Sequence, residues 1–552
     1  MSLHEDSNAN ATLFKDGRPI YAVAEARLNR VKYSGGFPEL AMKAALDYAN
    51  ISLSDVDVIL PANRTHFLPR MYRGLLPAGE HDYFGPRHKA WLYFQQALSR
   101  GGALSWLTGS LSRSMLKRRF PKLADFVDHH TAHAYSAWLT SGFDEATAVT
   151  SDNMGDGYSS RVFDCSGKEA RYLYGSSARH SPGQFYGEIA QLLGFHNLNA
   201  GKVTGLAAHG NPARAYPVME KLFALNAEKT GFVTPELLRR GKTRGLHGLL
   251  SSFSKEEIAA AAQKRLEDVM VDYVRTAVRN SGKPDVVLAG GTFANVVVNQ
   301  RILLLPEVRR VFIHPAMTDQ GISMGAGLAY LRESVTNEPL PTVFLGPDIF
   351  EEEAGQELER SGLRYERPDD MADVAAKALI DRRVVARCCG RVEYGPRALG
   401  NRSIMYRTDD PAVNTWLNSR LNRTEFMPFA PVTLDSHMDE CYKDTAGGEL
   451  ATRYMTITFE VREAMKRQSP GVVHLDGTAR PQIIREQDNP GYHAILQRFY
   501  ELTGTPTLVN TSFNMHGEPI VGSPYDAIRA FKASRLDHLI LGPFWVHRAD
   551  EG

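Results

Sequence analysis

The sequence predicts an α/β protein of two domains, the first of which is internally duplicated. The length of 552 residues suggests more than one domain, at about 100–200 residues each. Segments 7–24 and 146–163 each have the pattern of a β-hairpin within a mixed unit of helices and strands. Segment 335–350 has the proline-rich composition of a linker. We therefore expect one domain over 1–340 and a second over 345–552.

The elements of the first domain follow one another in a repeated order. The first hairpin, 7–24, precedes a predicted helix over 39–50 and a short strand over 56–60. A predicted helix over 127–139 leads to the second hairpin, 146–163. The repeat concerns the order of elements and not a clear sequence identity. This order predicts a duplicated α/β domain of the actin-like ATPase kind.

The segment 64–122 interrupts this order and is predicted to be an insertion of helices and loops. It is rich in Arg, Lys, Trp and Tyr, and Arg70 and Arg73 pair at helical spacing. A solvated face explains this composition, because charged runs commonly face water. A flap that recognises an acceptor molecule is the alternative, and the sequence leaves both open.

Two histidines four residues apart, His129 and His133, are candidates for metal binding. Positions i and i+4 of a helix lie on one face, so both imidazoles could reach a single ion. Asp152 follows an apolar strand, and Asp319 lies in a loop much later in the chain. We expect these segments to meet around a metal. A structural histidine pair with satisfied hydrogen bonds is the alternative.

Two glycine-containing segments of the first domain are candidates for phosphate binding. One holds Lys202 and Gly205; glycine permits close backbone approach and lysine suits a phosphate, although a plain turn is the alternative. In the other, a buried strand runs into Gly290 and Gly291 and then into a helix start at Asn295. That geometry presents N–H groups and the positive end of a helix to an anion or nucleotide.

The second predicted domain holds a glycine-punctuated loop, 390–403, after a predicted strand over 384–386. Three arginines in such a loop suit a phosphate cradle, because a guanidinium can bind phosphate through parallel hydrogen bonds. A solvated surface loop is the alternative. Further cationic, amide and hydroxyl groups follow along the chain: Arg480, Asn510 and Thr511.

Composition excludes several classes of function. The formal net charge of +1 gives no global basic field of the kind that nucleic-acid-binding proteins carry. Four irregularly spaced cysteines fit reduced thiols better than a disulfide framework or a zinc site. There is no apolar run of the roughly 18 residues that a membrane helix needs, and no signal-peptide pattern at the first residues. We expect a cytoplasmic protein that binds neither nucleic acid nor a membrane.

Together these motifs resemble those of the O-carbamoyltransferases of the nodulation and antibiotic-tailoring type, which include the tobramycin, cephalosporin and ansamycin enzymes. The resemblance spans nearly the whole chain. Its most specific parts are the run Gly-Pro-Arg-Ala-Leu-Gly-Asn-Arg-Ser from Gly395 and the run Asn-Thr-Ser-Phe-Asn from Asn510. The markers are Glu25, Arg27, Lys32, Pro38, 129–134, 201–210, Gly290, Gly291, Asn295, Asn299, 395–403, 476–480 and 510–521.

The resemblance implies an actin-like (ASKHA) N-terminal domain similar to the tRNA threonylcarbamoyl-transfer subunit, and an α+β C-terminal domain of the YrdC type. It implies that the C-terminal domain combines Mg-ATP with carbamoyl phosphate to give carbamoyl-adenylate. The N-terminal domain would then pass the carbamoyl group to a hydroxyl of a natural product or sugar, as in antibiotic biosynthesis. Because the adenylate reacts with water, a sheltered path between the domains is expected. A homodimer is a further expectation.

The resemblance also implies roles for single residues. His4 is the implied general base, since a neutral imidazole can take the acceptor's proton. The implied ligands of one divalent metal, most simply iron, are His129, His133, Asp152 and Asp319. The implied nucleotide contacts of the N-terminal domain are Lys202, Gly205, Gly290, Gly291 and Asn295. The implied ATP and carbamoyl phosphate contacts of the C-terminal domain are Arg397, Arg402, Ser403, Arg423, Arg480, Asn510 and Thr511.

The chain departs from the family's pattern at three places. Only three residues precede His4, which predicts a short first strand. Met427 stands where an arginine is common, so Arg420 or Arg423 would supply the charge from a shifted position. His516 also replaces a basic side chain, and a histidine binds phosphate in a pH-dependent way.

Two other functions fit part of the pattern. Threonylcarbamoyl transfer to tRNA would use a similar N-terminal domain, but the near-neutral charge and the fusion of both domains in one chain argue against it. A non-catalytic actin-like nucleotide-binding protein would need neither the loop 390–403, with its three arginines (the arginine-rich loop), nor the histidines His129 and His133.

Overall fold

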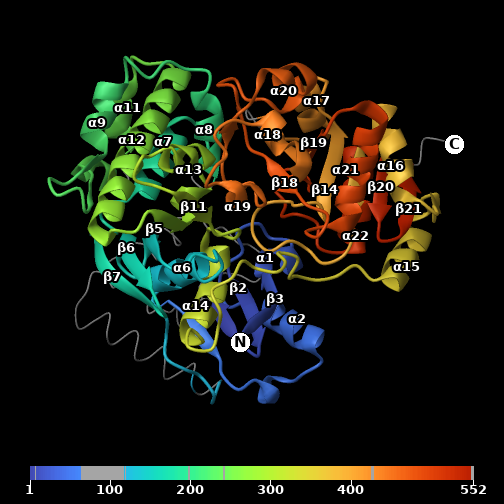
Figure 1. Cartoon of the computed structure of the whole chain (residues 1–552), viewed down its shortest axis with the longest axis horizontal. Helices are drawn as coiled ribbons and strands as arrows, with labels where there is room; N and C mark the ends of the chain where they lie inside the picture. The colour runs from blue at the N-terminus through green and yellow to red at the C-terminus, as the bar shows by residue number, and fades with distance from the viewer. Residues whose placement is uncertain are drawn as a thin grey trace.

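The computed structural model describes residues 1–5, 8–63, 117, 120–196, 199–239, 243–423 and 428–548. Nearly all of the predicted insertion over 64–122 lies outside the described residues, as does Met427. Three principal sheets organise the described chain, and the C-terminal one lies beside the two N-terminal ones (Figure 1). No described helix has both the length and the apolar character needed to cross a membrane.

The first sheet has four strands in the order β3-β2-β1-β4. Its centre is β1, which is antiparallel to β2 and parallel to β4. The last strand begins at Leu60, later than predicted, because Leu53–Asp55 form a 3₁₀ turn that Ser52 caps. The elements are β1 (Ser2–His4), β2 (Asn10–Lys15), β3 (Arg18–Ala24), α1 (Glu25–Asn29), α2 (Glu39–Ala49) and β4 (Leu60–Ala62).

The second sheet repeats this order with one more strand, as β7-β6-β5-β10-β11. In both sheets a hairpin meander is joined, at its first strand, by a parallel strand from later in the sequence. This repeat confirms the predicted duplicated actin-like domain. The strands are β5 (Ala146–Gly155), β6 (Tyr158–Ser166), β7 (Glu169–Ser177), β10 (Asp285–Ala289) and β11 (Arg310–Ile313).

Helices α6 (His129–Trp138) and α14 (Ile322–Tyr330) pack together between the two sheets (Figure 1). They approach closely at Gly325, where a Cβ atom would lie 1.8 Å from the carbonyl oxygen of Ala132. The hydroxyl of Ser2 in β1 donates to the carbonyl of Ser323 at 2.6 Å, across 321 residues of sequence. The first strand is therefore fixed by one of the last helices of its domain.

A helical layer covers the other face of the second sheet. Its longest member, α12, begins at a Ser254–Glu257 capping box and ends at Gly282 in the left-handed conformation. The segment 201–210 opens with a helix that packs on α12, so it is no open glycine turn. The helices are α7 (Pro182–Leu192), α8 (Gly201–Ala207), α9 (Tyr216–Leu222), α10 (Glu236–Arg239), α11 (Thr243–Leu250), α12 (Lys255–Ser281) and α13 (Val296–Leu303). A small hairpin joins this layer: β8 (Ala224–Leu225) and β9 (Phe232–Val233).

The third sheet has eight strands and belongs to a separate α+β C-terminal domain, as predicted. The last strand of the second sheet ends at Ile313 and the first strand of the third begins at Tyr365, so the predicted boundary at 340–345 falls between them. The strands are β12 (Tyr365–Glu366), β13 (Val385–Cys388), β14 (Arg402–Arg407), β15 (Ala430–Leu434), β18 (Gln482–Ile484), β19 (Thr507–Ser512), β20 (His538–Leu541) and β21 (Phe544–His547). A separate strand pair is β16 (Phe459–Glu460) and β17 (Thr478–Ala479).

Helices cover the C-terminal sheet. Buried side chains of α16 and α21 form an apolar cluster with strands β13, β15 and β20. The helices are α15 (Glu351–Ser361), α16 (Met371–Ile380), α17 (Val413–Arg420), α18 (Met438–Cys441), α19 (Glu449–Thr452), α20 (Glu463–Gln468), α21 (Pro490–Thr503) and α22 (Pro524–Ser534).

Candidate metal centre and anion site

The two predicted histidine ligands lie at the start of α6, one turn apart. Asp128 caps this helix, and its Oδ1 accepts a hydrogen bond from the N–H of Thr131 at 3.0 Å. Asp156 Oδ2 accepts from the N–H of His129 at 2.9 Å. These bonds fix the first turn, so both imidazoles face the space between the sheets.

Four side chains meet there: those of His129, His133, Asp152 and Asp319, with ligand atoms within 4.8 Å of one another. His133 Nε2 lies 3.4 Å from Asp152 Oδ2 and 3.6 Å from Asp319 Oδ1. His129 Nε2 lies 4.0 and 3.7 Å from the same two oxygens. Two ligand atoms that share a tetrahedral ion at about 2.1 Å stand about 3.4 Å apart. The spacing of the four groups therefore fits one metal ion.

Burial supports the same conclusion. Both imidazoles are buried, and in the described part of the chain neither Nε2 atom makes a hydrogen bond. A buried polar atom without a partner is costly, and a bound cation would remove that cost. Burial, and then the charge of neighbouring Asp152, raise the pKa of Asp319 to about 7. Two facing carboxylates with two imidazoles thus suit a divalent cation.

The double glycine lies directly against this centre. Gly290 has a φ of +104°, and a Cβ atom there would stand 2.1 Å from the carbonyl oxygen of Ser151. The N–H of Gly291 donates to Asp152 Oδ2 at 3.1 Å, and the N–H of Asn153 donates to Oδ1 at 2.7 Å. The segment predicted to bind a nucleotide therefore also orients a candidate metal ligand.

His4 is joined to the metal centre through Asn63, a residue that the sequence analysis did not single out. Asn63 Oδ1 lies 2.9 Å from His129 Nδ1, and Asn63 Nδ2 lies 3.2 Å from His4 Nδ1. The His4 and His129 rings are 6.4 Å apart between centroids. No spacing motif in the sequence predicts a role for Asn63, because only the parallel pairing of β1 with β4 brings it to His4.

The two N-terminal segments predicted to bind phosphate also come together. Asn295 Nδ2 donates to Gln263 Oε1 at 2.9 Å, and the Tyr186 hydroxyl donates to the same oxygen at 2.5 Å. The hydroxyls of Tyr186 and Thr204 are 2.9 Å apart, which connects α8 to this network. Lys202 lies half-buried on α8, and Gly205 is buried on the same helix.

In the C-terminal domain, the loop 390–403 is folded around a buried carboxylate. Glu393 Oε1 accepts hydrogen bonds from the N–H groups of Leu399, Asn401 and Arg402 at 3.0, 2.8 and 2.9 Å. Only 2% of Glu393 is exposed. This internal anion occupies a cluster of main-chain donors that would otherwise suit a ligand.

Several of the residues predicted to contact substrate are bonded within the protein. The guanidinium of Arg402 is fully buried and donates to the carbonyls of Cys389 and Gly390 at 2.8 and 2.9 Å. The other predicted contacts are bonded in the same way: Ser403 Oγ accepts from the N–H of Gly400, Asn510 Nδ2 donates to Gln482 Oε1, and Arg423 Nη1 donates to Thr511 Oγ1. In this structure these groups build the loop and its surroundings.

Arg397 and Arg480 differ from these groups. Among the described residues neither forms an ion pair with a carboxylate, and the Nε atom of each is buried without a hydrogen-bond partner. Burial lowers the pKa of Arg397 to about 10. Burial, and then the charge of Arg397, hold the pKa of Arg480 well below its usual range. Two neighbouring buried cations without an acidic partner in the described chain are a candidate site for an anion.

The family of the chain follows from sequence comparison. The profile of the carbamoyltransferase N-terminus matches residues 2–328, and that of the carbamoyltransferase C-terminus matches residues 376–548. This chain belongs to the carbamoyltransferase family. The two matches cover both domains described above, and they confirm the resemblance found in the motifs.

Two nodulation proteins are similar to this chain over most of its length. Nodulation protein NolNO of Sinorhizobium fredii (strain NBRC 101917 / NGR234) is 32% identical over 98% of this chain and 78% of its own length. Nodulation protein NolO of Bradyrhizobium diazoefficiens is 33% identical over 76% of this chain and 79% of its own. The crystal structure of T. kodakarensis HypF covers 61% of this chain and 48% of its own, at 14% identity and a TM-score of 0.35. A likeness of that size carries no argument here.

The carbamoyltransferase domains touch at the arginine-rich loop. Arg397 Nη2 donates to the carbonyl of Ala294, three residues after the double glycine, at 3.3 Å. Arg27 Nη2 donates to the carbonyl of Gly395 at 2.8 Å, and His314 Nε2 lies 3.1 Å from the Tyr394 hydroxyl. The loop that carries Arg397 therefore faces the segment that orients Asp152.

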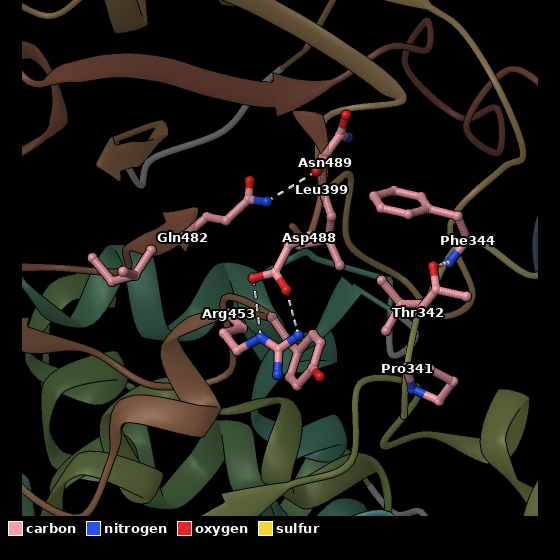
Figure 2. Close-up of a pocket in the computed structure, with 11 residues that line it drawn as sticks. Pro341, Thr342, Phe344, Leu399, Arg453, Gln482, Asp488 and Asn489 are labelled. Atoms are coloured by element: carbon pink, nitrogen blue, oxygen red, sulfur yellow. Dashed lines mark hydrogen bonds and ion pairs between the residues drawn. The ribbon is translucent and has the colours of Figure 1, made fainter. Parts of the chain in front are cut away.

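A small cavity of about 20 Å³ lies between the linker and the C-terminal domain, with Leu399 of the arginine-rich loop on its wall (Figure 2). Arg453 and Asp488 on its wall form an ion pair at 2.6 Å, and Gln482 Nε2 donates to the carbonyl of Leu399 at 2.9 Å. A volume of this size holds about one water molecule.

Proposed function

We propose that this carbamoyltransferase is an ATP-dependent O-carbamoyltransferase with two reaction sites. The C-terminal site forms carbamoyl-adenylate from carbamoyl phosphate and ATP. The N-terminal site transfers the carbamoyl group to a hydroxyl of a small molecule such as a natural product or sugar. The single observation that carries the proposal is that unpaired Arg397 contacts Ala294 beside the metal centre, so an anion site and a cation site adjoin.

The first step brings two polyanions together, so it requires fixed cations. Carbamoyl phosphate and water give carbamate and phosphate; a carbamate oxygen then attacks the α-phosphorus of ATP, and pyrophosphate leaves. Arg397 and Arg480 are the side chains proposed to hold the phosphoryl oxygens, since neither is neutralised within the described protein. Arg402, Ser403, Asn510 and Arg423 are proposed to hold the loop in shape for this binding.

In the second step the acceptor oxygen attacks the carbamoyl carbon, the bond from that carbon to the AMP oxygen breaks, and AMP leaves. His129, His133, Asp152 and Asp319 are proposed to hold a divalent metal, most simply iron. Such an ion supplies Lewis acidity and neutralises phosphate charge. The contacts of the arginine-rich loop with the N-terminal domain support a path that excludes water from the adenylate.

The first step can be tested by pyrophosphate exchange. We expect purified protein to exchange labelled pyrophosphate into ATP only when carbamoyl phosphate is present. Arg397→Ala should lower this exchange by about 10²–10³-fold, because a preorganised donor to a charged group is lost. Arg367→Ala is the matched control, since Arg367 lies on the surface paired with Glu351. Exchange that needs no carbamoyl phosphate, or that survives in Arg397→Ala, would contradict the assignment.

The acceptor and the metal are tested separately. Mass spectrometry over a panel of hydroxylated sugars and polyketides should find products in which one carbamoyl group replaces one hydrogen. Elemental analysis of protein purified without chelators should find about one transition-metal ion for each chain. Carbamoylated tRNA in place of small-molecule products would favour the threonylcarbamoyl alternative.

A further inference from the structure

Asn63 has a backbone that only a few residue types adopt readily. It follows β4 with a φ of +84°, in the left-handed region where asparagine is the most tolerated residue after glycine. Its N–H donates to the carbonyl of Val127 at 2.9 Å, and its side chain is buried. The amide is therefore held in one place between His129 and His4.

Two neighbours define which way the amide of Asn63 points. The carbonyl oxygen of Glu5 lies 3.5 Å from Asn63 Nδ2, and a carbonyl can only accept a hydrogen bond. On the other side, Oδ1 faces His129 Nδ1 at 2.9 Å. A histidine that ligates through Nε2 carries its proton on Nδ1, so it requires an acceptor there. Both neighbours place the oxygen toward His129 and the nitrogen toward His4.

This orientation determines the proton position on His4. Asn63 Nδ2 lies 3.2 Å from His4 Nδ1 and can only donate, so Nδ1 must accept. A neutral imidazole has one ring proton, which must then be on Nε2. The opposite tautomer would set Nδ1–H against Nδ2–H. If the Asn63 amide were rotated by 180°, its N–H group would face the Nδ1–H group of His129, and its oxygen would face the carbonyl oxygen of Glu5. Neither pair can form a hydrogen bond.

We propose that Asn63 is a positioning residue that holds neutral His4 with its proton on Nε2, so that His4 serves carbamoyl transfer as a hydrogen-bond donor. The role in transfer rests on the proposed function; the tautomer does not. His4 Nε2–H donates to the carbamoyl oxygen as the acceptor oxygen attacks the carbamoyl carbon. The bond to the AMP oxygen breaks, and the leaving phosphate, which gains negative charge, takes the hydroxyl proton. This role replaces the general base implied by the resemblance.

The tautomer is tested on zinc-loaded protein, because zinc is diamagnetic. Protein labelled with ¹⁵N at its 18 histidines is studied by two-bond ¹H–¹⁵N correlation spectroscopy, and His4→Gln identifies the His4 signals. We expect wild-type His4 to be protonated at Nε2. Asn63→Asp should move the proton to Nδ1, because a carboxylate accepts from both histidines. His130 is the internal control, since its Nε2 lies 3.1 Å from the carbonyl of Tyr158 and must stay protonated in both proteins.

Activity gives the second readout. Asn63→Asp should keep its zinc and its pyrophosphate exchange while carbamoyl transfer falls by about 10²–10³-fold. Asn63→Gly, which suits the positive φ, is the second variant and should leave His4 in a mixture of tautomers with an intermediate rate.

Two results would overturn the proposal. One is a wild-type His4 that is protonated at Nδ1. The other is an Asn63→Asp variant that transfers the carbamoyl group at the full rate although its His4 proton has moved to Nδ1. If no carbamoyl transfer is found in the wild type but the tautomers are as expected, the proposed function fails while the role of Asn63 in fixing the His4 proton stands.

Discussion

The candidate metal centre and the arginine-rich loop both hold buried charge, but of opposite sign. At the candidate metal centre, two carboxylates face two imidazoles: His129 and His133 lie one turn apart on α6, Asp152 lies within β5, and Asp319 begins a 3₁₀ turn. At the loop, Arg397 and its neighbour Arg480 have no carboxylate partner among the described residues, and the backbone of the loop is folded around the buried carboxylate of Glu393. The first region is the proposed site for a cation, and the second is the proposed site for an anion.

The difference teaches how each region keeps its geometry. The candidate metal ligands need few supports, because a helix, a strand and a 3₁₀ turn already set their directions. The loop has no regular structure between β13 and β14, so its order depends on side-chain hydrogen bonds, among them three from main-chain N–H groups to Glu393 and two from Arg402 to loop carbonyls. Removing one support should therefore harm the loop broadly, and the metal centre only at the removed ligand.

The largest expected effect is that of His133→Ala. This variant should lose bound metal and lower carbamoyl transfer by more than about 100-fold, because a ligand is removed outright. Pyrophosphate exchange should be unchanged, since the other site is intact. His493→Ala in the C-terminal domain is the control and should keep both. An equal loss of both steps in His133→Ala would show that the two regions are not separate.

Glu393→Ala should have the next largest effect, and on the other region. Three buried N–H groups would lose their acceptor, at about 1–3 kcal/mol for each one left unsatisfied. Urea denaturation should show lower stability, and pyrophosphate exchange should fall while bound metal is retained. Glu393→Gln keeps an acceptor oxygen, so its stability and its pyrophosphate exchange should lie between those of the wild type and those of Glu393→Ala. A stable Glu393→Ala protein with full exchange would remove the contrast between the regions.

Gly155→Ala is expected to act on the metal centre more mildly. A Cβ atom at Gly155 would lie 2.1 Å from His129 Cδ2, so the imidazole must turn away from its ligating position. Metal affinity measured by competition with a chelator should fall by about 10–100-fold. Gly248→Ala in α11 meets no atom within 4 Å and should leave affinity unchanged.

The smallest expected effect is that of Lys43→Ala. Lys43 and Asp47 form an exposed i,i+4 pair on α2, with 71% and 61% of their side chains exposed. Such pairs contribute about 0.3–0.5 kcal/mol. Thermal unfolding should shift slightly, and neither reaction should change. A large change in either rate would mean that surface charge, and not the two buried regions, governs activity.

Sequence alone predicted the parts of the molecule that depend on local spacing. The i,i+4 histidines, the double glycine and the duplicated hairpins each have a periodic or compositional signal, and the structure brings the four predicted ligands together. Asn63 and Glu393 have no such signal. Asn63 reaches its partners through strand pairing across 59 residues, and Glu393 acts through the curvature of a loop. The segment 201–210 was predicted with an open turn as one alternative, but packing on α12 makes its first seven residues helical.

The hydrogen bond between Ser2 and Ser323 has a consequence for how the chain acquires its structure during synthesis. The strand that carries His4 is fixed by a helix that is made about 320 residues later. Until then the first sheet lacks the helix that covers it and exposes apolar surface. Contacts at such separation slow folding and favour aggregation of incomplete chains. The N-terminal domain should therefore depend on chaperones during translation more than the C-terminal domain does.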